Sequence, residues 1–214
     1  MFVKVCGLTR TDDARQAVDA GATALGFIFV PDSPRHVTAE SVRAIVDALP
    51  PGTMTYGVFQ DATPAEIRDA VQRSGVSGVQ LHGKEPASYA GAIDRPLMKA
   101  AGLDELAALG WPPSVTLLLD AVSGDRRGGS GRQVDWERAA AVARERRVVL
   151  AGGLTPDNVA EAIATVRPHG VDVSSGVERS PGVKDHEKVA LFIARARRAF
   201  ELAHVGSHAD RDHD

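Results

Sequence analysis

The sequence predicts an α/β fold, namely a single-domain (β/α)8 TIM barrel, in which eight parallel strands alternate with helices and close into a ring. Eight short apolar runs alternate with helix-like segments along the whole chain. These runs are apolar on both faces, as is typical of buried parallel strands. The units run along the length of the 214-residue chain and leave no obvious second domain. An open doubly wound sheet is the alternative, and the filled length favours the closed barrel.

The predicted strands are Phe2–Cys6, Ala24–Phe29, Met54–Phe59, Gly78–Leu81, Pro96–Ala100, Val115–Asp120, Val148–Ala151 and Val171–Ser174.

The weakest and most irregular parts of this pattern lie in the second half of the chain. The fifth unit is the weakest, because its helix at Asp104–Leu109 spans only a turn or two. Glycine-rich Ser123–Gly131 predicts a mobile loop after the sixth strand. We expect residues 1–204 to form the barrel and the polar residues 205–214 to form a disordered C-terminal tail.

Four of the predicted helices carry start signals. Thr63-Pro64-Ala65-Glu66 is a capping box with proline at the first helical position. Thr155 is also followed by proline, ahead of a helix-like run from Val159 to Val166. Thr11 and Thr38 each supply a capping hydroxyl before the acidic residues of a first turn. These signals predict where the helices begin.

Composition and charge exclude several classes of function. The net charge of −3 provides no basic surface for nucleic acid. No apolar run is long enough to cross a membrane, and the N-terminus lacks a signal-peptide pattern. A single cysteine cannot form an intrachain disulfide. We therefore expect a cytoplasmic protein that binds neither nucleic acid nor membranes, as a monomer or a homodimer.

Two glycine-bearing turns follow the seventh and eighth predicted strands. The first contains Gly152 and Gly153, and the second contains Ser174, Ser175 and Gly176. Such turns expose backbone N–H groups, and two of them side by side can bind a phosphate. In a (β/α)8 barrel this place is formed by the loops after the last two strands. These five residues are our candidate phosphate-binding site.

Cys6 and Asp120 stand where the first and sixth predicted strands end, which is where barrels carry catalytic groups. For Cys6, a small buried apolar residue is an equally good interpretation. For Asp120, a catalytic role is favoured over a loop anchor, because a glycine-rich loop follows. The two strands would lie three places apart, on nearly opposite sides of the mouth. A base and an acid so placed suit an isomerisation without a metal or other cofactor, and no residues have metal-ligand spacing.

Three further polar residues occupy positions from which they could contact a ligand. Arg35 lies in a loop stiffened by two prolines and could bind a carboxylate or phosphate, or be an ordinary surface arginine. His82 follows the fourth strand and could bind a ligand or only its own loop. Asp172 lies inside the eighth strand, where a carboxylate must be paired or face the cavity. We favour the cavity, with Asp172 touching a sugar hydroxyl.

A series of motifs runs in order from about residue 2 to about residue 200. They are Lys4-Val5-Cys6-Gly7-Leu8-Thr9-Arg10, Gly26-Phe27-Ile28-Phe29, Ser33-Pro34-Arg35, Val79-Gln80-Leu81-His82-Gly83, Leu119-Asp120, Gly128-Gly129-Ser130-Gly131, Ala151-Gly152-Gly153-Leu154, Asp172-Val173-Ser174-Ser175-Gly176-Val177-Glu178 and Pro181-Gly182-Val183-Lys184-Asp185. Together they resemble the phosphoribosylanthranilate isomerase family. The chain departs from the family pattern at Arg132, where lysine is usual, and at Ser130, where threonine is commoner.

The resemblance implies a cofactor-independent Amadori rearrangement in tryptophan biosynthesis. The enzyme would open the furanose of N-(5-phosphoribosyl)anthranilate, a small phosphosugar, and yield a 1-deoxyribulose phosphate. Cys6 would be the general base at C2′ and Asp120 the general acid at the ring oxygen. Arg35 would hold the anthranilate carboxylate, and Asp172 and His82 would be polar groups beside the substrate. Backbone groups around Gly152, Gly153, Ser174, Ser175 and Gly176 would hold the phosphate.

Two alternatives remain on the sequence alone. A histidine-pathway isomerase, or its bifunctional relative, runs the same chemistry on the same barrel but resembles a pattern with a carboxylate at the first strand end, where this chain has Cys6. A non-catalytic phosphate-binding barrel would share the glycine turns. Such a binder needs neither Cys6 nor Asp120.

Overall fold

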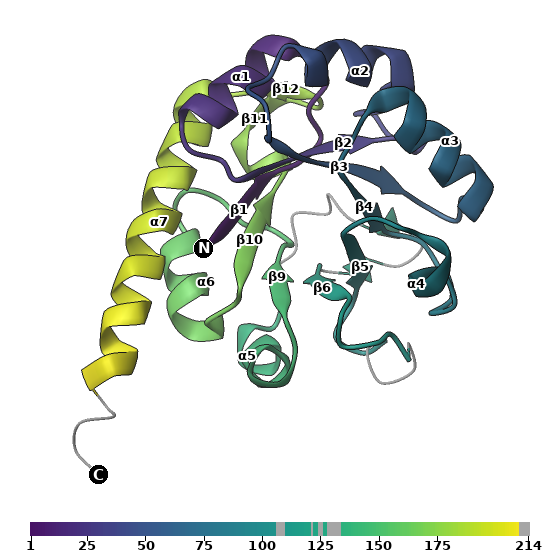
Figure 1. Cartoon of the computed structure of the whole chain (residues 1–214). Helices are drawn as coiled ribbons and strands as arrows, with labels where there is room; N and C mark the ends of the chain where they lie inside the picture. The colour runs from purple at the N-terminus through teal and green to yellow at the C-terminus, as the bar shows by residue number, and fades with distance from the viewer. Residues whose placement is uncertain (106–109, 121, 124–125, 128–133, 210–214) are drawn as a thin grey trace.

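The computed structural model describes residues 1–105, 110–120, 122–123, 126–127 and 134–209. Parallel strands close into a barrel, and their order around the ring is β1, β10, β9, β6, β5, β4, β3 and β2 (Figure 1). The strands of the ring are β1 (Phe2–Val5), β2 (Ala24–Ile28), β3 (Met54–Phe59), β4 (Gly78–Leu81), β5 (Leu97–Ala101), β6 (Thr116–Leu119), β9 (Val148–Leu150) and β10 (Gly170–Val173). The predicted barrel is confirmed, and the open doubly wound sheet is wrong.

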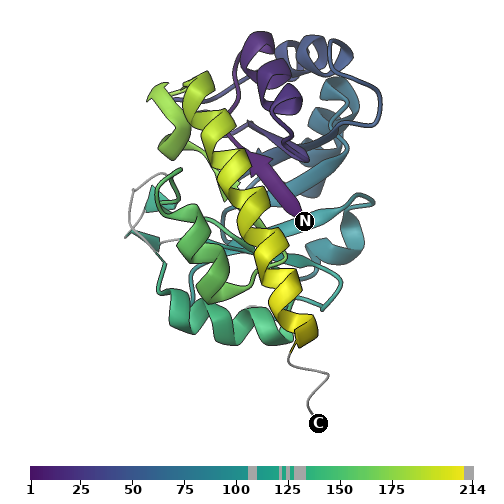
Figure 2. The ribbon, with the colours of Figure 1, turned by 90° about the vertical axis from the view of Figure 1, so that its left-hand side faces the viewer.

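Helices pack around the outside of the ring (Figures 1 and 2). They are α1 (Thr11–Asp19), α2 (Ala39–Asp47), α3 (Pro64–Ser74), α4 (Tyr89–Ala92), α5 (Trp136–Glu145), α6 (Val159–Val166) and α7 (His186–Ala209). The helix α4 has only 4 residues. The predicted helix at Asp104–Leu109 falls largely on residues 106–109, which lie outside the described residues.

The last helix, α7, crosses one side of the barrel from end to end (Figure 2). Its apolar stripe is buried against the barrel and consists of Val189, Phe192, Ile193, Ala196 and Phe200. The helix continues to Ala209, so residues 205–209 are helical although the sequence predicts a disordered tail from residue 205. The rest of the predicted tail, residues 210–214, lies outside the described residues.

Side chains along each strand alternate between the barrel interior and the helix layer. Val3 and Val5 belong to the large core between strands and helices, so Lys4 between them points into the barrel. The same alternation turns Asp172 inward from between Val171 and Val173. A smaller apolar cluster in the barrel interior unites side chains from five strands and one strand end: Ala24, Tyr56, Met98, Ala100, Leu118, Val149 and Ala151.

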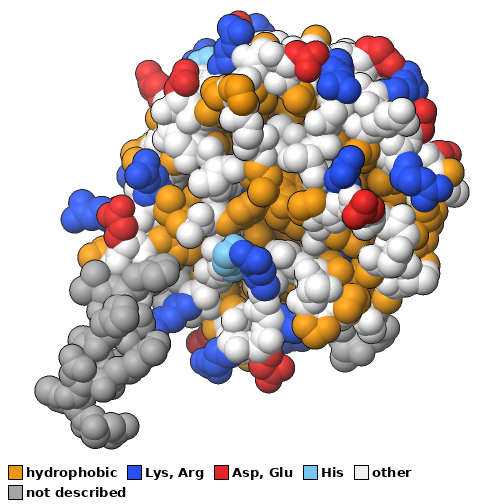
Figure 3. Space-filling view, in the orientation of Figure 1, with side chains coloured by type: hydrophobic (Ala, Val, Ile, Leu, Met, Phe, Trp, Pro, Cys, Tyr) orange, Lys and Arg blue, Asp and Glu red, His pale blue; other side chains and the backbone are white. Residues whose placement is uncertain are grey.

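Figures 1 and 3 look onto the end of the barrel where the strands begin. Hydrophobic side chains gather at the centre of this face, a histidine and a basic side chain lie next to them, and most other charged side chains lie towards its edge (Figure 3). Met54, at the start of β3, is 39% exposed. Barrel enzymes carry their sites at the other end, where the strands finish. No helix within the described residues is long and apolar enough to cross a membrane.

The capping signals at Thr63 and Thr38 are confirmed. The Thr63 hydroxyl accepts from the backbone N–H of Glu66 at 3.3 Å, and Glu66 Oε2 accepts from the Thr63 N–H at 2.7 Å. These two bonds complete the capping box of α3. Thr38 caps α2 by accepting from the Ser41 N–H at 3.2 Å. Both hydroxyls satisfy N–H groups that a helix start leaves without a partner inside the helix.

The capping signals at Thr11 and Thr155 are wrong. Thr11 is already the first residue of α1, which Arg10 precedes without a side-chain cap. Thr155 stands four residues before α6, and its hydroxyl accepts from the Asp157 N–H at 3.2 Å in a turn of its own. Asn158 accepts from the Thr155 N–H at 2.8 Å. This local turn competes with a helix start at proline, so α6 begins only at Val159.

Two short hairpins extend the loops at the far end of the barrel. Strands β7 (Val122–Ser123) and β8 (Arg126–Arg127) pair within the segment that the sequence predicts to be a mobile loop. The other residues of that loop, 124–125 and 128–131, lie outside the described residues, as do Ser130 and Arg132. After β10 come the 3-10 helix η2 (Ser175–Val177) and the hairpin of β11 (Glu178–Ser180) and β12 (Val183–Lys184).

The capping box gives a test of the local structure. Replacing Thr63 by alanine removes the hydroxyl that accepts from Glu66 N–H. We expect the free energy of unfolding to fall by about 1 kcal/mol, as measured by urea denaturation. Arg68→Ala, at an exposed position of the same helix, is the control and should change that free energy by less than about 0.5 kcal/mol. Equal effects of the two substitutions would contradict the capping role.

Candidate active site

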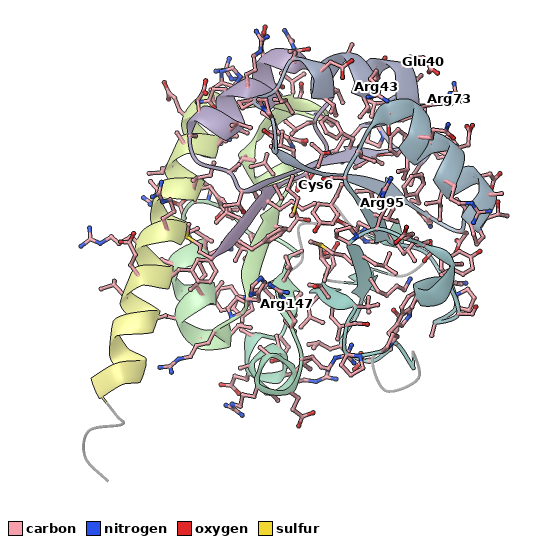
Figure 4. All side chains as sticks on the ribbon, in the orientation of Figure 1. Cys6, Glu40, Arg43, Arg73, Arg95 and Arg147 are labelled. Carbon is pink, nitrogen blue, oxygen red and sulfur yellow. The ribbon has the colours of Figure 1, made fainter. Side chains whose placement is uncertain are left out.

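The carboxyl ends of the strands bring the predicted catalytic residues to one end of the barrel. Cys6 directly follows β1 and Asp120 directly follows β6. Around the ring β10 and β9 separate β1 from β6, so the predicted spacing of three places is confirmed. Figure 4 shows Cys6 near the middle of the ring of strands. A base and an acid at these two positions would face each other across the mouth.

Cys6 packs against a glycine of the neighbouring strand. Its side chain is only 5% exposed, and its N–H donates to the Val173 carbonyl at 2.8 Å. A Cβ added to Gly26 of β2 would lie 2.7 Å from Cys6 Sγ and 2.9 Å from Lys4 Nζ. The sulfur and the ammonium therefore lie against the same point of β2. Glycine at position 26 makes room for both.

Asp172 forms a buried ion pair with Lys4. Lys4 Nζ donates to both carboxylate oxygens at 3.0 Å, and the two side chains are 0% and 7% exposed. Burial alone would lower the pKa of Lys4, but Asp172 and Cys6 raise it above its ordinary value, so the ammonium keeps its charge. The sequence indicated that Asp172 is either paired or faces the cavity, and the structure shows it paired with Lys4. Lys4, its partner, was missed as a site residue.

Burial is also the largest influence on the pKa of the Cys6 thiol. Burial raises this pKa, the Lys4 ammonium lowers it, and the Asp172 carboxylate raises it further. The Lys184 ammonium also lowers the pKa of Cys6. Cys6 is thus a buried residue, as one interpretation of the sequence had it, but its neighbours are charged rather than apolar.

Arg35 is held by a carboxylate of the chain itself. Its Nε and Nη2 donate to Glu178 Oε1 and Oε2 at 2.8 and 2.7 Å, a bidentate pair. The side chain is 13% exposed, so the ordinary surface arginine is wrong. Arg35 also lies over Gly7, where an added Cβ would be 2.6 Å from Arg35 Cδ and 2.8 Å from Ser174 Oγ. This contact places the guanidinium stem beside the end of β1.

Lys184 completes this group of charges. Its Nζ donates to Glu178 Oε1 at 2.8 Å and to the Ser174 carbonyl at 3.1 Å, and its side chain is fully buried. Glu178 thereby joins the loop after β2, which carries Arg35, to the hairpin after β10. Sequence reasoning missed Glu178 and Lys184. Their signal was present in the last two family-like motifs, which gave them no role.

His82 and Asp120 form one unit. His82 Nε2 lies 3.4 Å from Asp120 Oδ2, and His82 Nδ1 lies 3.4 Å from Gln80 Nε2. The side chains of His82 and Asp120 are 17% and 13% exposed, whereas Cys6 is 5% exposed. Solvent therefore reaches this pair more easily than it reaches Cys6. The sequence assigned these two residues separately. The structure brings them together because β4 and β6 flank β5 in the ring.

A second buried ion pair fixes the loop that follows His82. Lys99 Nζ donates to Glu85 Oε2 at 2.7 Å and to the Gly83 carbonyl at 2.6 Å, and both charged side chains are 0% exposed. Glu85 in turn accepts from the N–H groups of Asp61 and Gly83. Sequence reasoning missed this pair, although a lysine inside an apolar strand must find a partner.

The two glycine-bearing turns lie side by side, as predicted. They follow β9 and β10, which are neighbours in the ring. Gly152 and Gly153 have positive φ angles of 78° and 67°, which favour glycine. A Cβ on Gly176 would lie 2.0 Å from the Leu154 carbonyl oxygen, so the two loops touch there. Ser174 and Ser175 lead into η2 beside this contact. Phosphate binding by these loops stays a prediction.

Within the described residues, no group of three or more His, Cys, Asp and Glu side chains could hold a metal ion. The charges at the mouth are instead paired with one another.

The pairing of Glu178 predicts how stability depends on pH. Burial alone would raise the pKa of Glu178, but hydrogen bonds from Arg35 and Lys184 lower it below its ordinary 4.5. The unfolded chain then binds this proton more tightly than the folded one, so the stabilisation is complete above about pH 4.5 and is lost as the pH falls through the lower folded pKa. Urea denaturation as a function of pH should show a shallower acid slope for Glu178→Gln than for the wild type. Identical slopes would contradict this pairing.

Comparison with known proteins agrees with the resemblance of the motifs. A family model described as N-(5'phosphoribosyl)anthranilate (PRA) isomerase matches residues 3–195. The N-(5'-phosphoribosyl)anthranilate isomerase of Geobacter sp. (strain M21) is 48% identical over 199 residues, covering 92% of this chain and 98% of that protein. That of Geobacter sulfurreducens is 46% identical over 198 residues, covering 91% and 98%.

Solved structures give the same result. Phosphoribosyl anthranilate isomerase from Thermotoga maritima superposes with a TM-score of 0.86 at 40% identity, covering 92% of this chain and 99% of that one. A phosphoribosyl anthranilate isomerase in complex with reduced 1-(o-carboxyphenylamino)-1-deoxyribulose 5-phosphate has a TM-score of 0.82 at 38% identity, with the same coverage. The chain therefore belongs to the N-(5'-phosphoribosyl)anthranilate isomerase family.

Proposed function

We propose that this chain is an N-(5'-phosphoribosyl)anthranilate isomerase of tryptophan biosynthesis that works by general acid–base catalysis, with Cys6 as the base and Asp120 as the acid. Family membership supports the reaction. The observation that carries the assignment of roles is the placement of these two side chains at strand ends three places apart, beside the glycine-bearing turns. A bound sugar phosphate spanning the mouth would present opposite sides to the two groups.

The phosphate is bound by the loops after β9 and β10, through backbone groups of Gly152, Gly153, Ser174, Ser175 and Gly176. Support comes from the contact of these loops and from their position next to β1. A phosphate there places the sugar over Cys6. The solved relative in complex with reduced 1-(o-carboxyphenylamino)-1-deoxyribulose 5-phosphate supports a sugar phosphate as the class of ligand.

The anthranilate carboxylate is bound by Arg35. Two of the five guanidinium N–H groups donate to Glu178, which leaves others for a ligand and fixes the plane of the group in advance. Preorganised donors of this kind bind a carboxylate with little loss of side-chain entropy. His82 and Asp172 contribute polar contacts: His82 beside Asp120, and Asp172 through its pairing with Lys4 under the sugar.

The reaction then needs one proton delivered and one removed. Asp120 protonates the ring oxygen, the C1′–O bond breaks, and the nitrogen lone pair forms a C1′=N bond. The resulting iminium acidifies C2′, and the Cys6 thiolate takes the C2′ proton. The C–H electron pair forms C1′=C2′ while the C=N π pair returns to nitrogen. The enol finally shifts its hydroxyl proton to C1′ and gives the ketone, so no cofactor is consumed.

The oligomeric state and the location of the protein also belong to this proposal. One of the similar structures is of generated monomers of the dimeric phosphoribosylanthranilate isomerase from Thermotoga maritima, and a monomer or a homodimer remains our expectation for this chain. A cytoplasmic location stays a prediction, as does the absence of nucleic-acid and membrane partners.

The first test is turnover by the purified protein. Loss of anthranilate-type fluorescence reports consumption of N-(5-phosphoribosyl)anthranilate, and the histidine-pathway phosphoribosyl substrate is assayed in parallel. We expect turnover of the anthranilate substrate. Turnover of the histidine-pathway substrate alone would favour that isomerase, and turnover of neither would favour a non-catalytic phosphate-binding barrel.

The assigned roles predict large losses in two variants. Cys6→Ala and Asp120→Asn should each lower kcat about 100-fold or more, because each removes a positioned proton carrier. Asp94→Asn, at an exposed loop position before β5, is the matched control and should leave kcat within about twofold of the wild type. Retained activity in both catalytic variants would remove this mechanism.

The phosphate loops predict a binding defect. Gly176→Ala forces a methyl group against the Leu154 carbonyl and separates the two loops. We expect inhibition by inorganic phosphate to weaken about tenfold or more, since displaced N–H donors lose charge-assisted hydrogen bonds. Gly91→Ala, where an added Cβ meets nothing within 4 Å, is the control. An unchanged inhibition constant in a folded Gly176→Ala protein would contradict phosphate binding by these two loops.

A further inference from the structure

A buried lysine lies beside the proposed base. Lys4 is 0% exposed and sits inside the barrel, where an unpaired charge is costly. Its Nζ donates to both oxygens of Asp172 at equal distances of 3.0 Å, which fixes the direction of the ammonium. An ammonium has three N–H groups, so two directed at Asp172 leave one to point elsewhere. The mechanism above gives this cation no task.

The direction left over is that of the Cys6 sulfur. Lys4 and Cys6 are two residues apart on one strand and so project to the same side. The single point above Gly26 lies 2.7 Å from the sulfur and 2.9 Å from Lys4 Nζ. Gly26 offers no side chain that could separate them. The ammonium and the thiol are therefore neighbours, and both side chains are buried.

Three other charged groups act on the thiol. Asp172 faces it from β10, Lys184 from β12 and Arg35 from the loop after β2. Lys184 and Arg35 are both engaged by Glu178, whose carboxylate offsets part of their charge. Lys4 is the cation next to the sulfur on its own strand, and its partner Asp172 is the anion that opposes it.

We propose that Lys4 is a positioning residue for Cys6: its buried ammonium, oriented by Asp172, faces the sulfur and stabilises the thiolate that takes the substrate proton. This inference rests on the proposed function. Burial raises the pKa of the Cys6 thiol, and Lys4 limits that rise. Asp172 both holds the ammonium in place and moderates its effect, so the pair adjusts the basicity of the sulfur.

The test measures the thiol without turnover. Cys6 is the single cysteine of the chain, so the ultraviolet absorbance of the thiolate, taken as the difference from Cys6→Ser, titrates this one group. The wild type, Lys4→Met and Asp172→Asn are titrated, and their folding is checked by circular dichroism. The acid limb of kcat/KM is measured for the same proteins.

The two variants should shift the titration in opposite directions. At a fixed pH below the wild-type midpoint, Lys4→Met should reduce the thiolate fraction roughly tenfold or more. Asp172→Asn should increase it, because the thiolate becomes the main anionic neighbour of the ammonium. The acid limb of kcat/KM should move with the titration in each case. If the pair were merely structural, both variants would lower activity, but they would not shift the thiol titration or the acid limb of kcat/KM in opposite directions.

A double variant keeps the proposal testable if Lys4→Met does not fold. Lys4→Met with Asp172→Asn removes both charges of this buried pair, and its comparison with Asp172→Asn isolates the lysine. Lys99→Met with Glu85→Gln removes a buried lysine pair that does not involve Cys6 and is the matched control, which should leave the thiol titration unchanged. An unmoved titration on loss of Lys4, or equal shifts in the control, would overturn the proposal. The titration decides this even if the wild type fails to turn over its substrate.

Discussion

The ion pair of Lys4 and Asp172 is the constraint on which the rest of the site depends. The two residues are register partners on β1 and β10, so they lie where the last strand of the ring meets the first. Two hydrogen bonds of 3.0 Å hold the pair inside the barrel, whose interior also contains the smaller apolar cluster. Such a pair contributes little net stability after desolvation, but losing one partner would leave a bare buried charge. The barrel must therefore close in the register that brings them together.

Charged groups organise the mouth in pairs rather than singly. Glu178 holds Arg35 and Lys184, and Glu85 holds Lys99 and the loop after β4. Each carboxylate accepts from more than one element of the fold, so each ties loops that are distant in sequence. Loops positioned in this way can present a ligand with groups already in place. Fixed dipoles and charges of this sort need no reorganisation when charge develops in the substrate.

Much of this could be predicted from the sequence, and the limits have physical causes. Apolar runs reveal the strands because burial on both faces leaves a strong local signal, and the strand ends reveal Cys6 and Asp120. The pairing of His82 with Asp120, and of Arg35 with Glu178, depends on which strands become neighbours, which no local pattern contains. Thr155 misled because a threonine followed by proline can also start a turn.

The buried lysines were the missed signal that the sequence did contain. Lys4 and Lys99 each lie inside an apolar strand, where a charge requires a partner, but the identity of the partner is set by the closed ring. A lysine on an exposed helix surface needs no such partner, because water solvates its charge. Charged residues inside predicted barrel strands thus indicate a network even when its members stay unknown.

Gly26 carries a consequence for the genetics of this chain. Every single-nucleotide missense change of a glycine codon adds at least a β-carbon, and here that atom would press on the Cys6 sulfur and the Lys4 ammonium together. No single-nucleotide missense change at this position is therefore conservative. Suppressors of a Gly26 mutation should be reversions, or substitutions that shorten a side chain on the facing strand. Gly26 should therefore change rarely as the gene evolves.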